Sequence, residues 1–358
     1  MTRGDRAIAD PDKLRQFMTK MVSDIGAAVS VPLVRTGMRL GLYKAMDGAG
    51  PITSVALAEK AGISERYARE WLAQNAASGY LTYEPSRKTF ELPPEQAMAF
   101  AREDSHVYIG GTVEAVCAIY PTQPKVEQAF LSGGGIEWGE HAGCLFCAAG
   151  AMLRPRYIAN ILQKWLPALN GVKAKLEVGA AVADVGCGTG HSTLIMAKAF
   201  PNSTFVGYDF HEPSIDHARD QARLTEGLDN VRFEVATAKN FSARDLDLVT
   251  FFDVLHDLGD PVGAAAHVRQ SLKPDGVWML MEPLAGDATE DNLTPVGRIA
   301  YALSAMACIP VSLSQEVGAA LGAQAGQKRL AEVIKGGGFR EVRRAAETPF
   351  NMVLEARP

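Results

Sequence analysis

From about residue 180 the chain repeats a pattern that few folds can accommodate. Short apolar runs alternate with amphipathic stretches at intervals of roughly 20 to 30 residues, and the runs read AAVADVG, TFVGYDF, VRFEVAT, LDLVTFFDVL and GVWMLMEP. Strands that alternate with helices pair into a parallel sheet through right-handed crossovers. Two further runs, EVRRAAET and NMVLEARP, are close enough to form a hairpin. The pattern therefore predicts a doubly wound, mostly parallel α/β sheet that ends in an antiparallel strand.

The first third of the chain has the element order of a winged helix. A helix, a short helix, a longer helix and two strands follow one another at residues 31–48, 53–61, 64–78, 80–83 and 88–92. Gly62 and Gly79 follow the second and third helices, and glycine is the usual residue just past a helix end. We predict a mainly helical winged-helix domain at residues 1–110. The second domain covers residues 111–358, with helices at 111–174 and the sheet core from about 175.

A glycine-rich turn, VADVGCGTGHST, closes the first apolar run. Its glycines come at two-residue steps, at Gly186, Gly188 and Gly190. Glycines at the carboxyl end of a strand let the backbone turn tightly and approach a ligand. A dinucleotide fingerprint requires a glycine where His191 stands, and Asp184 would put a carboxylate where a pyrophosphate belongs. A ligand with a cationic amine suits this turn better than a phosphate, although the glycines could also simply build a turn.

The second apolar run ends in Asp209, 19 residues after Gly190, at a distance where an acid can accept both ribose hydroxyls of an adenosine. Phe210 beside it offers a flat apolar face to adenine. The sequences DVGCGTG and GYDF resemble class I S-adenosylmethionine-dependent methyltransferases, over about residues 175–358. The resemblance implies S-adenosylmethionine as the cofactor, with Asp184 near its ammonium group and Asp209 on its ribose. It also implies cofactor contacts after the third and fourth strands, at Thr237, Ala238, Phe252 and Asp253, with Thr237 replacing an acid that is common in the family.

The loop after the fourth strand reads DVLHDLGDP. In small-molecule O-methyltransferases with an N-terminal winged helix, which this chain resembles, the loop holds a His-Asp-Trp pattern whose histidine is the general base. His256 and Asp257 match this pattern, and Leu258 replaces the tryptophan. Glu282 ends the fifth strand, where the same family keeps an acid beside its base. The resemblance implies that His256, assisted by Glu282, deprotonates a small-molecule acceptor; alternatively, His256 only lines the cofactor pocket.

Charge separates this enzyme from a second class of protein, a transcriptional regulator that senses S-adenosylmethionine and binds DNA. The net charge of the chain is −5, and residues 30–95 hold eight Lys or Arg against seven Asp or Glu. A domain that neutralises several phosphates should be strongly basic. We therefore favour the enzyme, with a winged helix that forms a homodimer and no nucleic-acid partner.

Other segments exclude some sites and leave one open. The N-terminal segment has no apolar core, and the weakly polar run at 299–314 is short and contains Pro310, so we predict a cytoplasmic protein without a membrane partner and with five reduced cysteines. His141, Cys144 and Cys147 have zinc-like spacing but no nearby fourth ligand, so we predict no metal. Residues 285–326 form a long connection that could cover a substrate pocket, join a dimer interface or belong to the core.

Overall fold

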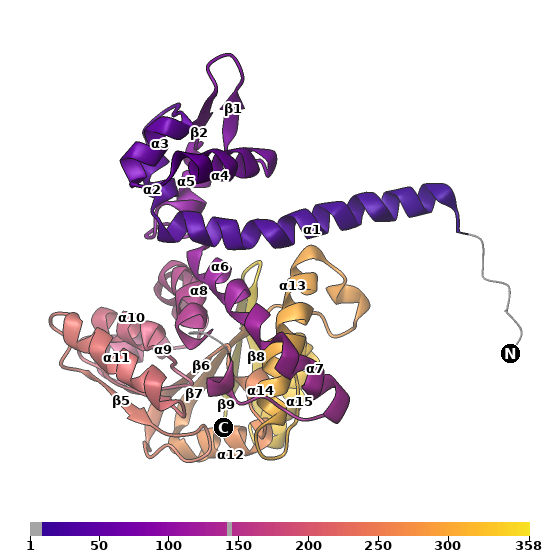
Figure 1. Ribbon diagram of the computed structural model, residues 1–358. Coiled ribbons are helices and arrows are strands. Elements are labelled where there is room, and N and C mark those ends of the chain that lie inside the picture. The colour runs from indigo at the N-terminus through magenta and orange to yellow at the C-terminus, as the bar shows by residue number, and fades with distance from the viewer. Residues whose placement is uncertain (1–8, 142–144) are drawn as a thin grey trace, which may run out of the picture. The chain divides into compact units, whose positions relative to one another are not determined.

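The computed structural model describes residues 9–141 and 145–358. The chain divides between Cys117 and Ala118 into two compact units (Figure 1). The first unit contains helices and one small hairpin: α1 (Pro11–Arg39), α2 (Leu42–Met46), α3 (Ser54–Ala61), α4 (Glu65–Ala77), β1 (Thr82–Glu84), β2 (Thr89–Glu91) and α5 (Pro94–Phe100), with α6 (Gly110–Ile119) at the division. The predicted order of helices followed by a hairpin is therefore present.

Local sequence explains the boundaries of the short helices. Thr53 precedes α3, and its hydroxyl accepts a hydrogen bond from the backbone N–H of Ala56 at 3.2 Å. Gly62 ends the helix in the left-handed conformation, at φ 66°. In the core of the unit, the Tyr43 hydroxyl donates to Asn75 Oδ1 at 2.5 Å, and the Tyr43 ring meets Trp71 edge to face. These contacts fix α2 against α4.

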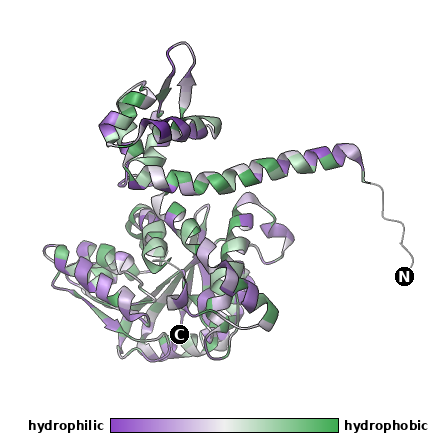
Figure 2. Cartoon of the chain, in the orientation of Figure 1, coloured by the Kyte–Doolittle hydropathy of each residue, from purple (hydrophilic) through white to green (hydrophobic). Residues whose placement is uncertain are grey.

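Helix α1 begins about twenty residues earlier than the predicted helix. Asp10 caps it by accepting the backbone N–H groups of Asp12 and Lys13, at 2.9 and 3.3 Å, and Pro11 occupies the first turn. Figure 2 shows apolar residues recurring along this helix. Exposed apolar side chains follow one another at steps of three or four residues, at Leu14, Met18, Val22, Ile25, Val29 and Leu33. The helix therefore carries an exposed apolar stripe.

The second unit is built on a seven-stranded sheet of order β5-β4-β3-β6-β7-β9-β8. Its strands are β3 (Ala181–Val185), β4 (Thr204–Asp209), β5 (Val231–Val235), β6 (Leu246–Phe252), β7 (Leu272–Pro283), β8 (Glu341–Glu347) and β9 (Asn351–Arg357). The pairs from β5 to β7 are parallel, and β9 is antiparallel to both β7 and β8. The predicted doubly wound sheet with an antiparallel end is confirmed.

Helices cover both faces of this sheet (Figure 1). The helices of the second unit are α7 (Gln123–Ser132), α8 (Leu145–Asn160), α9 (Val172–Val178), α10 (His191–Ala199), α11 (Glu212–Leu224), α12 (Pro261–Ser271), α13 (Pro295–Leu303), α14 (Ile309–Leu313) and α15 (Gly326–Gly336). Strand β3 shows how the core forms, because successive side chains alternate between faces. Ala183 and Val185 pack in the cluster with α12 and α15, whereas Val182 packs with α9 and α10. The switch point between β3 and β6 thus lies between two buried layers.

The connection after β7 is helical and packs on the loop after β6. A π turn at Ser304–Cys308 joins α13 to α14, so helical residues run through Pro310. Pro310 lies in the first turn of α14, where its missing N–H costs no regular helical bond. The Ser312 hydroxyl donates to the Leu258 carbonyl at 2.8 Å, and the Gln315 amide donates to the Asp257 carbonyl at 3.0 Å.

Two of the described helical stretches, Pro11–Arg39 and Pro295–Leu313, are long and apolar enough to cross a membrane by length and composition, a test that core helices also pass. Among the described cysteines, Cys117, Cys187 and Cys308 are free and Cys147 is disulfide-bonded, so the prediction of reduced thiols is wrong for Cys147. Cys144 of the zinc-like triplet lies outside the described residues.

Candidate active site

The glycine-rich turn follows β3, and its conformation requires glycine. Gly186, Gly188 and Gly190 all have positive φ, at 71°, 52° and 81°. A Cβ on Gly190 would lie 2.8 Å from the Phe233 ring and 2.9 Å from the Ala218 methyl group. The backbone N–H groups of Gly186 and Cys187 donate to the Tyr208 carbonyl, at 2.7 and 3.0 Å, which fixes the turn to β4. The predicted spacing of glycines therefore builds a rigid turn at the carboxyl edge of the sheet.

Asp184, at the end of β3, is fully buried and already has three donors inside the protein. The Ser192 and Thr193 hydroxyls donate to its Oδ2, both at 2.6 Å. The Thr250 hydroxyl donates to Oδ1 at 2.9 Å. Burial raises the pKa of Asp184 to about 6, while these hydroxyls oppose the rise. The carboxylate thus ties β3, α10 and β6 together, a structural role that sequence reasoning missed.

Asp209, at the end of β4, joins its strand to the glycine turn. Its Oδ2 accepts the Gly188 N–H and its Oδ1 accepts the His211 N–H, each at 2.9 Å. Burial raises the pKa of this carboxyl group. Each oxygen still has a lone pair that can accept a further hydroxyl. The adjacent Phe210 side chain is 50% exposed, so its ring is available at the strand end where sequence predicts an adenine contact.

The residues at the ends of β5 and β6 differ in their exposure and in the contacts that they make within the protein. Thr237 is exposed, and its hydroxyl accepts the Lys239 N–H at 3.3 Å, whereas Ala238 is buried in the core. Phe252 is buried and its ring lies 5.2 Å from that of Tyr157. Asp253 has a positive φ of 65°, which is rare for a residue other than glycine.

The Asp253 side chain has an oxygen that could accept a hydrogen bond from a ligand. Its Oδ1 is buried and has no hydrogen-bond partner among the described residues. Burial raises the pKa of Asp253 to about 6, although nearby His256 opposes this. Buried polar atoms in proteins normally have partners, and an exception in a strained conformation often marks a functional site. Asp253 is therefore a better acceptor for an ammonium group than Asp184.

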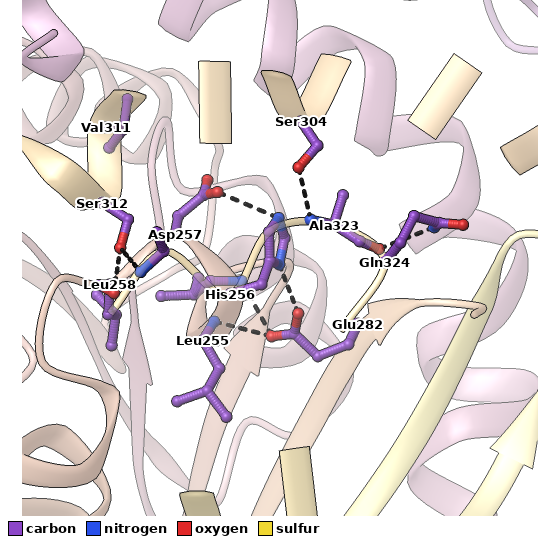
Figure 3. A network of polar contacts seen from close by, with 12 residues as sticks. Leu255, His256, Asp257, Leu258, Glu282, Ser304, Val311, Ser312, Ala323 and Gln324 are labelled. Atoms are coloured by element: carbon purple, nitrogen blue, oxygen red, sulfur yellow. Dashed lines mark hydrogen bonds and ion pairs between the residues drawn. The ribbon is translucent and has the colours of Figure 1, made fainter. Parts of the chain in front are cut away.

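His256 and Glu282 form a buried pair at the ends of β6 and β7 (Figure 3). His256 Nδ1 lies 2.5 Å from Glu282 Oε2. The other oxygen, Oε1, accepts the Leu255 N–H at 2.8 Å and the Val254 N–H at 3.3 Å. Burial alone lowers the pKa of His256, but the carboxylates of Asp257 and Glu282 outweigh it and raise the pKa above its usual value. The geometry fixes the imidazole with Nδ1 toward Glu282 and Nε2 turned away from it.

The Nε2 side of His256 meets two further groups. Asp257 Oδ1 lies 3.2 Å from Nε2 (Figure 3). The Cys308 thiol, from the π turn after α13, interacts with both His256 and Asp257. Burial raises the pKa of this thiol to about 12, so it is protonated. Sequence reasoning missed Cys308 because it lies in another element, far along the chain, with no motif around it.

Comparison with known proteins finds a match in each of the two units. Residues 176–332 match the family model described as a methyltransferase domain, and residues 27–102 match the model described as an Rv2258c-like winged HTH domain. A ubiquinone biosynthesis O-methyltransferase of Thiobacillus denitrificans is 32% identical over 122 residues, which are 33% of this chain and 50% of that protein. A trans-aconitate 2-methyltransferase of Deinococcus radiodurans is 32% identical over 114 residues, 32% of this chain and 42% of that protein. The chain thus spans about half the length of these curated relatives.

Solved structures extend the likeness to the whole fold. A putative O-methyltransferase from Nostoc punctiforme superposes with a TM-score of 0.73 at 20% identity, covering 98% of this chain and all of that one. Human N-acetylserotonin methyltransferase gives 0.68 at 16% identity, covering 100% and 99%.

The second unit therefore has the class I methyltransferase fold, and its residues 176–332 match a methyltransferase domain. In the first unit, residues 27–102 match a winged HTH domain, so the resemblance to methyltransferases with an N-terminal winged helix is confirmed. All the predicted site residues that end strands, Asp184, Asp209, Phe252 and Glu282, lie on one edge of the sheet.

Proposed function

We propose that this protein is an S-adenosylmethionine-dependent methyltransferase that transfers a methyl group to a hydroxyl of a small molecule, with His256 as the general base. One observation carries the proposal. A histidine held by a buried glutamate lies at the same sheet edge as the glycine turn, four residues after Phe252, which ends β6, and three residues after Asp253. The edge thus combines a ligand-binding turn with a proton acceptor.

The residues at this edge fit the cofactor in charge and in hydrogen-bonding capacity. Asp209 has spare lone pairs for ribose hydroxyls, and the exposed ring of Phe210 offers a stacking surface for adenine. Thr237 and Ala238 lie next along the edge and would border the adenine. The unpartnered Oδ1 of Asp253 suits the methionine ammonium group.

The remaining predicted contacts would act through the backbone and through packing. Gly186 and Gly190 shape the turn, Gly188 has open space beside it for a ligand, and Phe252 supports the floor of the site. Asp184 would then act through the turn that it stabilises rather than by direct contact, because its oxygens already accept three hydroxyls.

Glu282 prepares His256 for its role as a base. When bound, S-adenosylmethionine supplies an electrophilic methyl group. By holding Nδ1–H, Glu282 leaves Nε2 as the atom that accepts a proton. The raised pKa of His256 lies closer to the pKa of a phenol, near 10, than that of an ordinary histidine does. An adjacent cationic ligand favours the neutral imidazole, which is the form that a base requires. His256 therefore takes the acceptor proton most readily when the cofactor site is filled.

Replacing His256 by glutamine tests this role. We expect His256→Gln to keep cofactor affinity within a few-fold and to lower turnover by about 10² to 10⁴, the usual worth of a general base. The residual activity should rise with pH as the acceptor ionises, and Glu282→Gln should have a milder effect. Phenols, catechols and hydroxyquinones should be screened first for an acceptor. If the variant loses cofactor affinity but keeps its turnover at saturation, His256 only lines the cofactor pocket.

We also propose that the first unit forms a homodimer, through the apolar stripe of α1. A second copy would cover side chains such as Val22 and Ile25, which are 68% and 57% exposed. Val22→Glu combined with Ile25→Glu should shift the sedimenting species from dimer to monomer, while Gln16→Glu on the same helix should not. A wild-type monomer at micromolar concentration would refute the proposal.

The charge pairing on α4 argues against nucleic acid as a partner. Arg66 is paired with Glu70 at 2.6 Å, and Arg69 with Glu65 at 2.6 Å, so both arginines of this helix are already neutralised. A DNA-reading helix needs free cationic groups for phosphates. The absence of nucleic-acid and membrane partners and the cytoplasmic location stay predictions. Salt-sensitive binding to a defined duplex would favour the regulator instead.

A further inference from the structure

On the Nε2 side of His256, three side chains offer ligand atoms for a metal ion that the sequence does not predict. His256, Asp257 and Cys308 each offer one ligand atom, and these three atoms lie within 4.8 Å of one another. Two come from the loop after β6 and the third from the π turn, an element type that is rare and often found at functional sites. A nitrogen, an oxygen and a sulfur therefore converge from separate elements.

Their spacing suits a small tetrahedral ion. With usual zinc bond lengths, neighbouring nitrogen, oxygen and sulfur ligands lie about 3.4 to 3.6 Å apart in a tetrahedron. Nε2 and Asp257 Oδ1 are already 3.2 Å apart. Three protein ligands leave a fourth position open, as in zinc sites that bind a further ligand.

Glu282 supplies the outer support that such a site needs. Histidine ligands of zinc commonly donate their other ring N–H to a carboxylate, which fixes the tautomer and makes the ligating nitrogen more basic. His256 Nδ1 lies 2.5 Å from Glu282 Oε2, and Glu282 is itself held by two backbone N–H groups. The arrangement that prepares Nε2 for a proton therefore also prepares it for a cation.

We propose that His256, Asp257 and Cys308 bind a thiophilic divalent cation, Zn²⁺ or its analogue Cd²⁺, and that the bound ion masks the base and reversibly inhibits the enzyme. On binding, the Cys308 S–H bond breaks, its proton passes to solvent, and the thiolate lone pair forms the bond to the metal. Thiolate and imidazole select Zn²⁺ over Mg²⁺ and Ca²⁺, which prefer oxygen ligands. Metal binding is independent of the proposed function; the inhibition rests on the proposed role of His256.

Cadmium titration of the full-length protein, without added thiols, tests the binding. A Cd–thiolate bond gives an ultraviolet charge-transfer band, which should appear at one equivalent in the wild type and in Cys117→Ser, a control in the first unit. Cys308→Ser should abolish the band. Asp257→Asn should keep the band but weaken Cd²⁺ affinity, and Glu282→Gln should weaken it by about 10- to 100-fold. Circular dichroism and thermal melting should establish that each variant is folded.

Several results would overturn the site: no band in the wild type, a band that persists in Cys308→Ser, or equal affinity for Mg²⁺ in calorimetry. Activity assays then separate the two proposals. Zn²⁺ should inhibit the wild type, chelation should restore it, and Cys308→Ser should need at least about tenfold more Zn²⁺, in line with the loss of a ligand. Stoichiometric binding without inhibition would retain the metal site but refute His256 as the base.

Discussion

The hydrogen bond between Thr250 and Asp184 offers the sharpest test of how the cofactor edge is held together. Thr250 lies in the middle of β6 and is fully buried, and its hydroxyl donates to Asp184 Oδ1 at 2.9 Å. Thr250→Val keeps the shape and removes only this donor. Because the other carboxylate oxygen retains its two hydroxyl donors, the variant isolates one bond of the three.

The expected cost depends on whether Asp184 is ionised. Its pKa is about 6 in the folded chain against 3.8 as the reference, so folding disfavours the ionised carboxylate by about 3 kcal/mol. The free energy of unfolding therefore falls as pH rises from 3.8 to 6. A hydrogen bond to a charged group contributes about 1.5 to 3 kcal/mol and a neutral one about 0.5 to 1.5. Thr250→Val should therefore destabilise the second unit by about 1.5 to 3 kcal/mol at pH 8 and by roughly half as much at pH 5.

Thermal melting measures this difference directly. For a unit of this size, about 1.5 to 3 kcal/mol lowers Tm by about 3 to 12 °C. Thr204→Val is the matched control, because Thr204 begins β4 of the same sheet with an exposed side chain, and its effect should stay within about 0.5 kcal/mol. An equal loss for Thr250→Val at both pH values, or a loss no greater than that of Thr204→Val, would refute the reasoning.

Two further predictions concern the same edge and the helix behind it. Asp209→Asn should weaken S-adenosylhomocysteine binding in calorimetry at least about tenfold, since a carboxylate accepts ribose hydroxyls better than an amide does; unchanged affinity would contradict the assignment. His191, whose pKa burial lowers to about 4, resists protonation when folded, so its contribution to stability is lost as pH falls below 6.5. His191→Gln takes up no proton and should lose about 2 kcal/mol less than the wild type between pH 7.5 and 5 in urea unfolding; equal losses would refute this.

The sequence predicts most of the sheet because its signals are local. Continuous apolar runs and the glycine spacing indicate the strands and the turn without reference to distant residues. Thr250 left a readable signal too, since it is a polar residue inside an apolar run that should be buried on both faces. The start of α1 was also available, because Asp10 followed by Pro11 is a helix-start pair. Cys308 was not, since its approach to His256 depends on a π turn and on tertiary packing.

The four acidic residues at the ends of strands have different roles, which depend on the hydrogen-bond donors that each carboxylate already has. Asp184 accepts three hydroxyls and has become part of the frame. Asp209 accepts two backbone N–H groups and retains capacity, while one oxygen of Asp253 has no partner among the described residues. Glu282 is held by two N–H groups and passes its remaining capacity to His256. Sequence position makes all four look like ligand-binding residues, but only an acid with an unused acceptor can bind a ligand without breaking the fold.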